Sequence, residues 1–175
     1  MSEGEQGSRG AGEVLPPSGQ SVCAIALGSN LGDSEAILTA ALDTLDGLPD
    51  ITVVARSRLY KTAPVGPPQP DYCNCCALLH TTMPPLALMR QLLAVEQQFG
   101  RVRRERWGPR LLDIDLVLYG DFTMETPELT LPHPRFHERA FVLVPLSEIA
   151  PDWRHPILGK TVGELVGECD RSGIR

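Results

Sequence analysis

The sequence lacks the features that define several large classes of protein. No stretch approaches the roughly 18 consecutive apolar residues that a membrane-spanning helix needs. Residues 1–20 have no apolar core and a single Arg, so they are neither a secretory signal nor a good transit peptide. The pattern GxxxxGK(S/T) is absent, which excludes a P-loop. Positive charge is scarce: 16 Lys and Arg against 22 Asp and Glu leave a net charge of −6, which disfavours a nucleic-acid partner.

The 175 residues have the composition of one globular domain, with 42% hydrophobic and 22% charged residues. We expect residues 1–20 to be a disordered leader and residues 21–175 to be a single, monomeric domain. The five cysteines are an odd number in a chain without an export signal, which predicts reduced thiols in the cytoplasm. Cys73 and Cys76 form C-x-x-C without a second pair at zinc spacing, so we expect them to be small buried hydrophobes.

Hydrophobic periodicity predicts strands and helices in the order β-α-β-β-α-β. Strands are expected at residues 22–27, 51–60, 72–82 and 111–119, with loops at 62–71 and 100–110. Two helices are expected between these strands, each with apolar residues that recur about one turn apart. These residues are Ile37, Ala41, Leu45 and Leu48 in the first helix, and Leu88, Leu92, Val95 and Phe99 in the second. This order is the plan of an α+β, ferredoxin-like sandwich. We expect the last third to add a strand pair near 122–131 and short helices near 141–149 and 161–168.

Two aspartates in the fourth predicted strand suggest a metal site. Successive strand residues point to opposite faces, so Asp113 and Asp115 share one face and Ile114 points to the other. Two carboxylates facing the same way repel each other unless cations lie between them. Hard oxygen ligands suit Mg²⁺ ions that also bind phosphate oxygens. The alternative is a solvated outer face of an edge strand.

The loop before this strand concentrates positive charge. It holds five arginines in ten positions: Arg101, Arg103, Arg104, Arg106 and Arg110. A guanidinium group can donate two parallel hydrogen bonds to the oxygens of one phosphate. Gly100, Gly108 and Pro109 suggest a loop that closes on its ligand. Arginines together with paired aspartates indicate phosphoryl-type transfer with a metal. The alternative is an ordinary solvated run of charges.

Further residues offer groups that a flat heterocycle and a phosphate could use. Tyr72 presents a ring face, and Asn74 presents an amide with both donors and acceptors. His133 lies between two prolines that restrict its backbone, and Arg139 and Phe141 follow closely. His133 is therefore a candidate hydrogen-bond donor to a phosphate group. Each has a structural alternative: Tyr72 as a core residue, Asn74 as a turn residue and His133 as a loop histidine.

These residues resemble a known family, 6-hydroxymethyl-7,8-dihydropterin pyrophosphokinase of folate biosynthesis. The resemblance covers about residues 21–153, and its most specific block is Arg106-Trp107-Gly108-Pro109-Arg110 running into Asp113-Ile114-Asp115. The other matching segments are residues 26–32 (ALGSNLG), 60–66 (YKTAPVG), 70–74 (PDYCN), 131–134 (LPHP) and 139–143 (RAFVL).

The resemblance implies a reaction and a set of roles. The enzyme would transfer the pyrophosphoryl group of ATP to the hydroxymethyl oxygen of the pterin and release AMP. Asp113 and Asp115 would hold two Mg²⁺ ions. The pterin ring would lie between Tyr72 and Phe141, with Asn74 at its pyrimidine edge and Thr62 and Val65 nearby. The implied ATP ligands and loop residues are Glu96, Arg101, Arg103, Arg106, Trp107, Arg110, His133 and Arg139, of which Arg101 and Arg110 would act in catalysis.

The chain departs from the family pattern at two positions. Glu128 stands where some members carry an arginine that helps hold the nucleotide, and Leu93 stands where some carry a glutamine. Two rival hypotheses remain. The first is a nucleotide-binding module that has lost turnover, which intact Asp113, Asp115, Arg110 and His133 disfavour. The second is a ferredoxin-like nucleic-acid binder, which the net charge of −6 disfavours.

Overall fold

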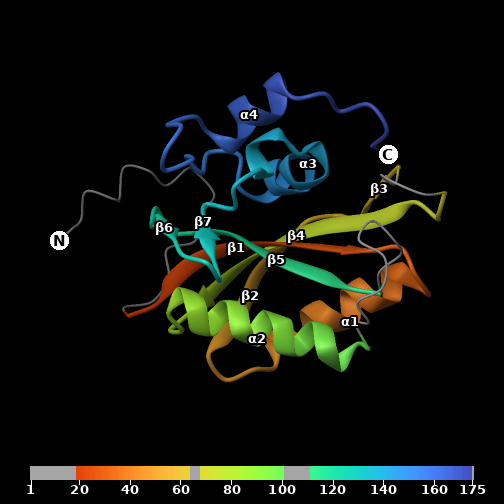
Figure 1. The fold of residues 1–175 in the computed structure, drawn as a ribbon, viewed down its shortest axis with the longest axis horizontal. Helices are drawn as coiled ribbons and strands as arrows, with labels where there is room; N and C mark the ends of the chain where they lie inside the picture. Colours follow the sequence, from red (N-terminus) through yellow and green to blue (C-terminus); the bar gives the residue numbers. More distant parts are fainter. Residues whose placement is uncertain (1–18, 64–67, 101–110, 175) are drawn as a thin grey trace.

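An antiparallel sheet forms the centre of the computed structural model, which describes residues 19–63, 68–100 and 111–174 (Figure 1). The expected leader, residues 1–20, lies almost entirely outside the described residues. The strands run in the order β2-β4-β1-β5, and β3 pairs with β4 as well. Their bounds are β1 Ser21–Ser29, β2 Ile51–Arg56, β3 Tyr60–Thr62, β4 Tyr72–Thr81 and β5 Asp113–Tyr119. With one helix between β1 and β2 and another between β4 and β5, this is the predicted ferredoxin-like arrangement.

Two helices cover one face of the sheet. The first, α1 (Ser34–Asp46), begins at Asp33, whose side chain accepts the backbone N–H of Ala36 at 3.2 Å. The second, α2 (Pro85–Gln98), begins with a proline in its first turn, where the missing N–H costs nothing. In the ranges that the structure describes, neither these helices nor any other is long and apolar enough to cross a membrane.

The first core lies between these helices and the sheet. Leu88, Leu92 and Val95 of α2 are buried as the periodicity predicts. In α1 the stripe is wider than predicted: Leu38 and Leu42 are buried beside Ala41 and Leu45, whereas Ile37 is only partly buried. The strands contribute Ile25, Leu27, Leu79, Ile114 and Leu116 to the same cluster.

A second core covers the opposite face of the sheet. It lies under the short helices η2 (Phe136–Glu138), α3 (Ala140–Ile149) and α4 (Val162–Glu168). Figure 1 shows α3 and α4 on the far side of the sheet from α1 and α2. The buried cluster joins Ala24, Ala26, Cys76 and Leu78 of the sheet to Phe136, Leu143, Leu146, Trp153 and Leu165. The predicted short helices therefore form a third layer, and this layer is the reason why β1 and β4 are apolar on both faces.

The prediction of one continuous strand at residues 51–60 is wrong, because the structure divides this segment into β2 and β3. Ser57 lies at the break, where its N–H donates to the carbonyl of Cys76 at 2.9 Å and its hydroxyl accepts the N–H of Cys76 at 2.9 Å. The side chain of Ser57 thus replaces part of the strand ladder. The predicted strand pair near residues 122–131 is confirmed as β6 (Met124–Glu125) and β7 (Thr130–Leu131).

All five cysteines are free, as predicted, and four of them are buried: Cys23, Cys73, Cys75 and Cys76. Burial raises the pKa of Cys75 to about 12 and that of Cys76 well above its ordinary value. We expect the native protein at neutral pH to expose at most the partly buried Cys169 to a thiol reagent, and the unfolded protein to react at all five. Counting modified thiols by mass spectrometry with and without denaturant tests this. Rapid native modification of several cysteines would contradict the core described above.

Candidate active site

The two aspartates lie on the face of the sheet that the second core covers. Asp115 pairs with Ala26, a member of the second core, and Asp113 pairs with Gly28. Ile114 between them is buried in the first core. The predicted alternation is therefore confirmed: the two carboxylates share one face, and their neighbours Ile114 and Leu116 are buried in the first core on the other.

Next to the aspartates on this face lies the amide of Asn74. Gly28 pairs with Asp113 on one side and with Asn74 on the other, so the three residues form one row across the sheet. A Cβ atom at Gly28 would lie 3.0 Å from Oδ1 of Asn74 and 3.8 Å from the ring of Tyr72. Gly28 is thus the residue that lets the amide and the ring lie close over the sheet.

The amide of Asn74 has a fixed orientation. Its Nδ2 donates to the hydroxyl of Thr62 at 2.7 Å, and both side chains are buried. Thr62 in turn pairs with Tyr72 across β3 and β4. The structure therefore brings together three of the predicted pterin residues, while Val65 lies outside the described residues.

His133 lies close to both Asp115 and Arg139. The N–H of His133 donates to the carbonyl of Val117 at 2.9 Å, which fixes this segment to β5. Burial lowers the pKa of His133 below its ordinary value, and this effect outweighs the opposing charge of Asp115; the nearby Arg139 lowers the pKa further. His133 is therefore mainly neutral at neutral pH.

Arg139 connects this group to the start of α3. Its guanidinium carbon lies 5.8 Å from the centre of the Phe141 ring, within the range of a cation–π contact. The ring of Phe141 is 38% exposed, so it has a free surface on which a flat ligand could stack. Phe141 and Arg139 thus belong to the same face of the sheet as Asp115.

A pocket of about 330 Å³ lies beside β5 and joins several of these groups. Its polar lining includes Glu96, Asp113, Asp115 and His133, and its apolar lining comes from α2, β5 and the segment 127–134. Both departures from the family pattern line it as well: Leu93, and Glu128, whose Oε1 lies 2.7 Å from Nη2 of Arg90. At this rim the chain presents a carboxylate paired with an arginine.

Sequence analysis missed the role of Asn30. Its Nδ2 donates to Oε1 of Gln69 at 2.8 Å and to the carbonyl of Pro70 at 3.0 Å, so it ties the turn after β1 to the proline-rich loop. The sequence drew attention to this region only as residues 26–32 of the family resemblance. A polar side chain directly after a buried strand was the available signal, but its partners lie about 40 residues away.

Glu148 of α3 holds β3 in place beneath the site. Its Oε1 accepts the hydroxyl of Tyr60 at 2.7 Å, and its carboxylate also accepts the N–H of Arg58. Burial acts to raise the pKa of Glu148, but the hydrogen bonds from Tyr60 and Arg58 outweigh it and lower the pKa below its ordinary value.

The lowered pKa predicts a pH-dependent contribution to stability. A carboxylate with a lowered folded-state pKa stabilises the protein above its unfolded-state pKa, and this contribution is lost as the pH falls through the folded-state pKa. We expect Glu148→Gln to lower the free energy of unfolding by about 0.5 kcal/mol at neutral pH, the size of a solvent-screened ion pair. Denaturant unfolding should give converging curves for the two proteins as the pH falls below the ordinary range of glutamate. A difference that persists in acid would contradict the assigned cause.

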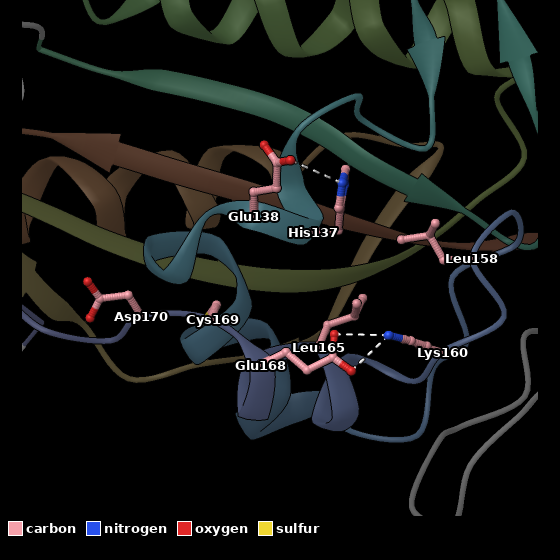
Figure 2. A pocket seen from close by; sticks show the side chains of 8 residues that line it. All are labelled: His137, Glu138, Leu158, Lys160, Leu165, Glu168, Cys169 and Asp170. Carbon is pink, nitrogen blue, oxygen red and sulfur yellow. Dashed lines mark hydrogen bonds and ion pairs between the residues drawn. The ribbon is translucent and has the colours of Figure 1, made fainter.

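A separate pocket of about 420 Å³ lies between η2 and α4 (Figure 2). Lys160 Nζ donates to both carboxylate oxygens of Glu168 there, at 3.0 and 2.8 Å. None of the predicted site residues lines it, so the pocket beside β5 is the candidate site.

The arginine loop lies outside the described residues. This applies to Arg101, Arg103, Arg106, Trp107 and Arg110. The described residues alone place two carboxylates and a histidine around one pocket, and an arginine close to that histidine and beside an exposed aromatic ring. On a ferredoxin-like sheet, these groups are typical of an enzyme that transfers phosphoryl-type groups.

Comparison with known proteins gives the particular family. The model of the 7,8-dihydro-6-hydroxymethylpterin-pyrophosphokinase (HPPK) family matches residues 24–151. The chain is 46% identical over 150 residues to the 2-amino-4-hydroxy-6-hydroxymethyldihydropteridine pyrophosphokinase of Synechocystis, covering 86% of this chain and 77% of the relative. It is 45% identical over 151 residues to the enzyme of the same name from Pseudomonas aeruginosa, covering 86% of this chain and 93% of the relative. The chain belongs to the HPPK family and is a pyrophosphokinase, which confirms the resemblance found in the sequence.

A solved structure confirms the fold. The wild-type HPPK-DHPS of Plasmodium falciparum, crystallised with pteroate, superposes with a TM-score of 0.69 at 13% identity. The match covers 85% of this chain and 42% of the Plasmodium chain, so this chain spans less than half of that longer protein.

Proposed function

We propose that the sheet face around Asn74, Asp113 and Asp115 is the active site at which this chain carries out the reaction of its family. That reaction transfers the pyrophosphoryl group of ATP to the hydroxymethyl oxygen of 6-hydroxymethyl-7,8-dihydropterin in folate biosynthesis. One observation carries the proposal: Gly28 pairs with Asn74 on one side and Asp113 on the other. The amide for the pterin and the Asp113 carboxylate thus lie on the same row of the sheet, and Asp115 lies on the same face beside Ala26.

The pterin end is built from side chains of β3, β4 and α3. Tyr72 and Phe141 supply ring faces, and Asn74 supplies an amide whose orientation Thr62 fixes at 2.7 Å. Because Nδ2 of Asn74 already donates to Thr62, its Oδ1 remains to accept an N–H from the pyrimidine edge of the pterin. The family resemblance adds Val65 to the residues proposed to bind the pterin.

The nucleotide end is the pocket beside β5. Met89, Leu92 and Leu93 form an apolar wall suited to a flat base, and His133 and Arg139 lie where N–H donors can meet phosphate oxygens. The family resemblance adds four further ATP ligands: Arg103, Arg106, Trp107 and Arg110. It also implies that Arg101 and Arg110 act in catalysis.

The carboxylate pair fits a magnesium site that nucleotide completes. Among the described residues, no group of three or more His, Cys, Asp or Glu could hold a metal ion unaided. Mg²⁺ in nucleotide-dependent enzymes is typically held by one or two carboxylates together with substrate phosphates, and Asp113 and Asp115 supply that number. When bound, two Mg²⁺ ions would neutralise the charge of the triphosphate.

The residues of the chain then have separate tasks in the transfer. The pterin residues hold the hydroxymethyl oxygen near the β-phosphorus, where a new P–O bond forms as the bond to the AMP oxygen breaks. His133 and the cationic Arg139 donate hydrogen bonds to the triphosphate, and the charge that develops is stabilised by donors already in place. The hydroxyl proton passes to solvent water, and the products are the pterin diphosphate and AMP.

Product analysis tests the reaction. ATP and Mg²⁺ are incubated with the protein, with and without 6-hydroxymethyl-7,8-dihydropterin, and the nucleotides are separated. We expect AMP only when the pterin is present. ADP would indicate transfer of a single phosphoryl group, and bound ATP without turnover would favour a binding module instead.

A substitution tests the pterin end. We expect Tyr72→Ala to weaken pterin binding about tenfold, because loss of one stacking ring removes roughly 0.5–1.5 kcal/mol beyond the lost contact area. ATP affinity, measured in the same titration calorimetry series, should not change. Unchanged pterin affinity would show that Tyr72 does not contact the pterin. Tyr119→Phe, which alters a tyrosine outside the proposed site, serves as the control.

A further inference from the structure

A buried carboxylate of α2 contacts the backbone between the two aspartates. Glu96 is only 3% exposed, and its Oε2 accepts the N–H of Ile114 at 2.6 Å. Ile114 is the residue between Asp113 and Asp115. Glu96 also lines the pocket that both aspartates line.

The sheet explains why this hydrogen bond is needed. β5 is at one end of the strand order and, in the part of the chain that the structure describes, has β1 on one side and no strand on the other. In an antiparallel pair, alternate residues turn their N–H groups toward the neighbouring strand and away from it. Because the N–H of Ile114 points to Glu96, Asp113 and Asp115 are the residues that turn toward Gly28 and Ala26 of β1.

The carboxylate itself has a rigid support. Leu92 and Val95, on the turn before Glu96, are 1% and 0% exposed in the first core. Glu96 therefore projects from a helix that packing holds in place. Three consecutive residues of β5 are thus fixed from both sides, by β1 and by α2.

We propose that Glu96 is a positioning residue that sets the two metal-binding carboxylates for the divalent cation of the nucleotide complex. This inference rests on the proposed function of Asp113 and Asp115. Glu96 acts through the backbone of Ile114, whereas the family resemblance implied a place among the ATP ligands. Groups that orient metal ligands from behind typically change metal affinity by about 10–100-fold when they are removed.

Three variants separate positioning from charge and from general stability. Glu96→Met removes the acceptor and keeps a side chain of similar length. Glu96→Gln keeps an acceptor oxygen and removes the charge. Gln97→Met is the control, because Gln97 is the exposed neighbour on the same helix.

Two measurements are made on each protein. Amide hydrogen exchange followed by NMR reports on the N–H of Ile114 without any ligand. Titration calorimetry with a non-hydrolysable ATP analogue gives the Mg²⁺ concentration at which nucleotide binding is half-maximal. For Glu96→Met we expect faster exchange at Ile114 and a Mg²⁺ requirement raised by about tenfold or more. Glu96→Gln should keep slow exchange and change the requirement less, and Gln97→Met should change neither.

Fast exchange at Ile114 with an unchanged Mg²⁺ requirement would overturn the proposal, because Glu96 would then only stabilise the strand. Should Glu96→Met fail to fold, Glu96→Asp decides, since its shorter carboxylate keeps the charge and cannot reach Ile114. A wild-type Mg²⁺ requirement in that variant would equally overturn the proposal. Failure of the proposed function has a different signature: the wild-type protein would release no AMP, whereas exchange at Ile114 would still respond to Glu96.

Discussion

Asp115→Asn is expected to lower kcat/KM for AMP release by roughly a thousandfold, because a metal ion bound at such a site contributes several kcal/mol to transition-state stabilisation. The amide has nearly the shape of the carboxylate but lacks its charge. Asp115 is exposed, and the strand that carries it is held by the apolar residues on either side. The free energy of unfolding should therefore change by no more than about 0.5 kcal/mol.

Steady-state assays of AMP release and thermal unfolding of the same samples test both halves of this result. Asp121→Asn is the matched control, since Asp121 is an exposed aspartate just beyond the end of the same strand. It loses the same charge and should keep full activity. Wild-type activity in Asp115→Asn would show that Asp115 does not hold the metal. Unfolding of this variant would show instead that the carboxylate supports the structure.

The aspartate pair could be predicted because its evidence is local. The two-residue period of a strand alone puts Asp113 and Asp115 on one face, and no knowledge of the rest of the chain is required. The same holds for α2, where buried residues recur one turn apart, and for the buried cysteines in an apolar run. Local periodicity therefore predicted the ferredoxin-like order of strands and helices.

Contacts between distant segments could not be predicted in this way. The hydrogen bonds of Asn30 to Gln69 and Pro70 span about 40 residues, and that of Glu148 to Tyr60 spans 88. No period in the sequence relates such partners. Glu96 is a related case: the resemblance marked the residue, but only the folded chain brings its carboxylate to the N–H of Ile114.

The third layer was missed for a similar reason. The sequence predicted the short helices near residues 141–149 and 161–168, and it shows that residues 22–27 of the first predicted strand are all apolar. It did not connect the two, because short helices with irregular apolar patterns give no direction for their buried side. The structure connects them through Phe136, Leu143 and Trp153, which pack against the sheet in the second core.

Phe136→Ala should test this third layer most severely. Phe136 is fully buried, and its ring stacks on His155 with centroids 5.3 Å apart. Removing a buried phenylalanine side chain typically costs about 3–5 kcal/mol, a large part of the roughly 5–15 kcal/mol that keeps a domain folded. Denaturant unfolding followed by circular dichroism measures the loss. Phe122→Ala is the control, because Phe122 is 48% exposed and should lose little stability.

The same substitution is expected to weaken nucleotide binding at temperatures where the variant is still folded. Phe136 lies between His133 and Arg139, the two residues predicted to donate hydrogen bonds to phosphate. Its N–H donates to the carbonyl of His133 at 3.4 Å, and its carbonyl accepts the N–H of Arg139 at 3.1 Å. A cavity under this turn would let both side chains shift, whereas the predicted pterin residues of β3 and β4 would keep their places. Calorimetry should therefore show a loss of ATP affinity with pterin affinity preserved. Equal losses of both would mean that the third layer supports the whole face of the sheet, and no loss of stability would mean that it contributes little to the fold.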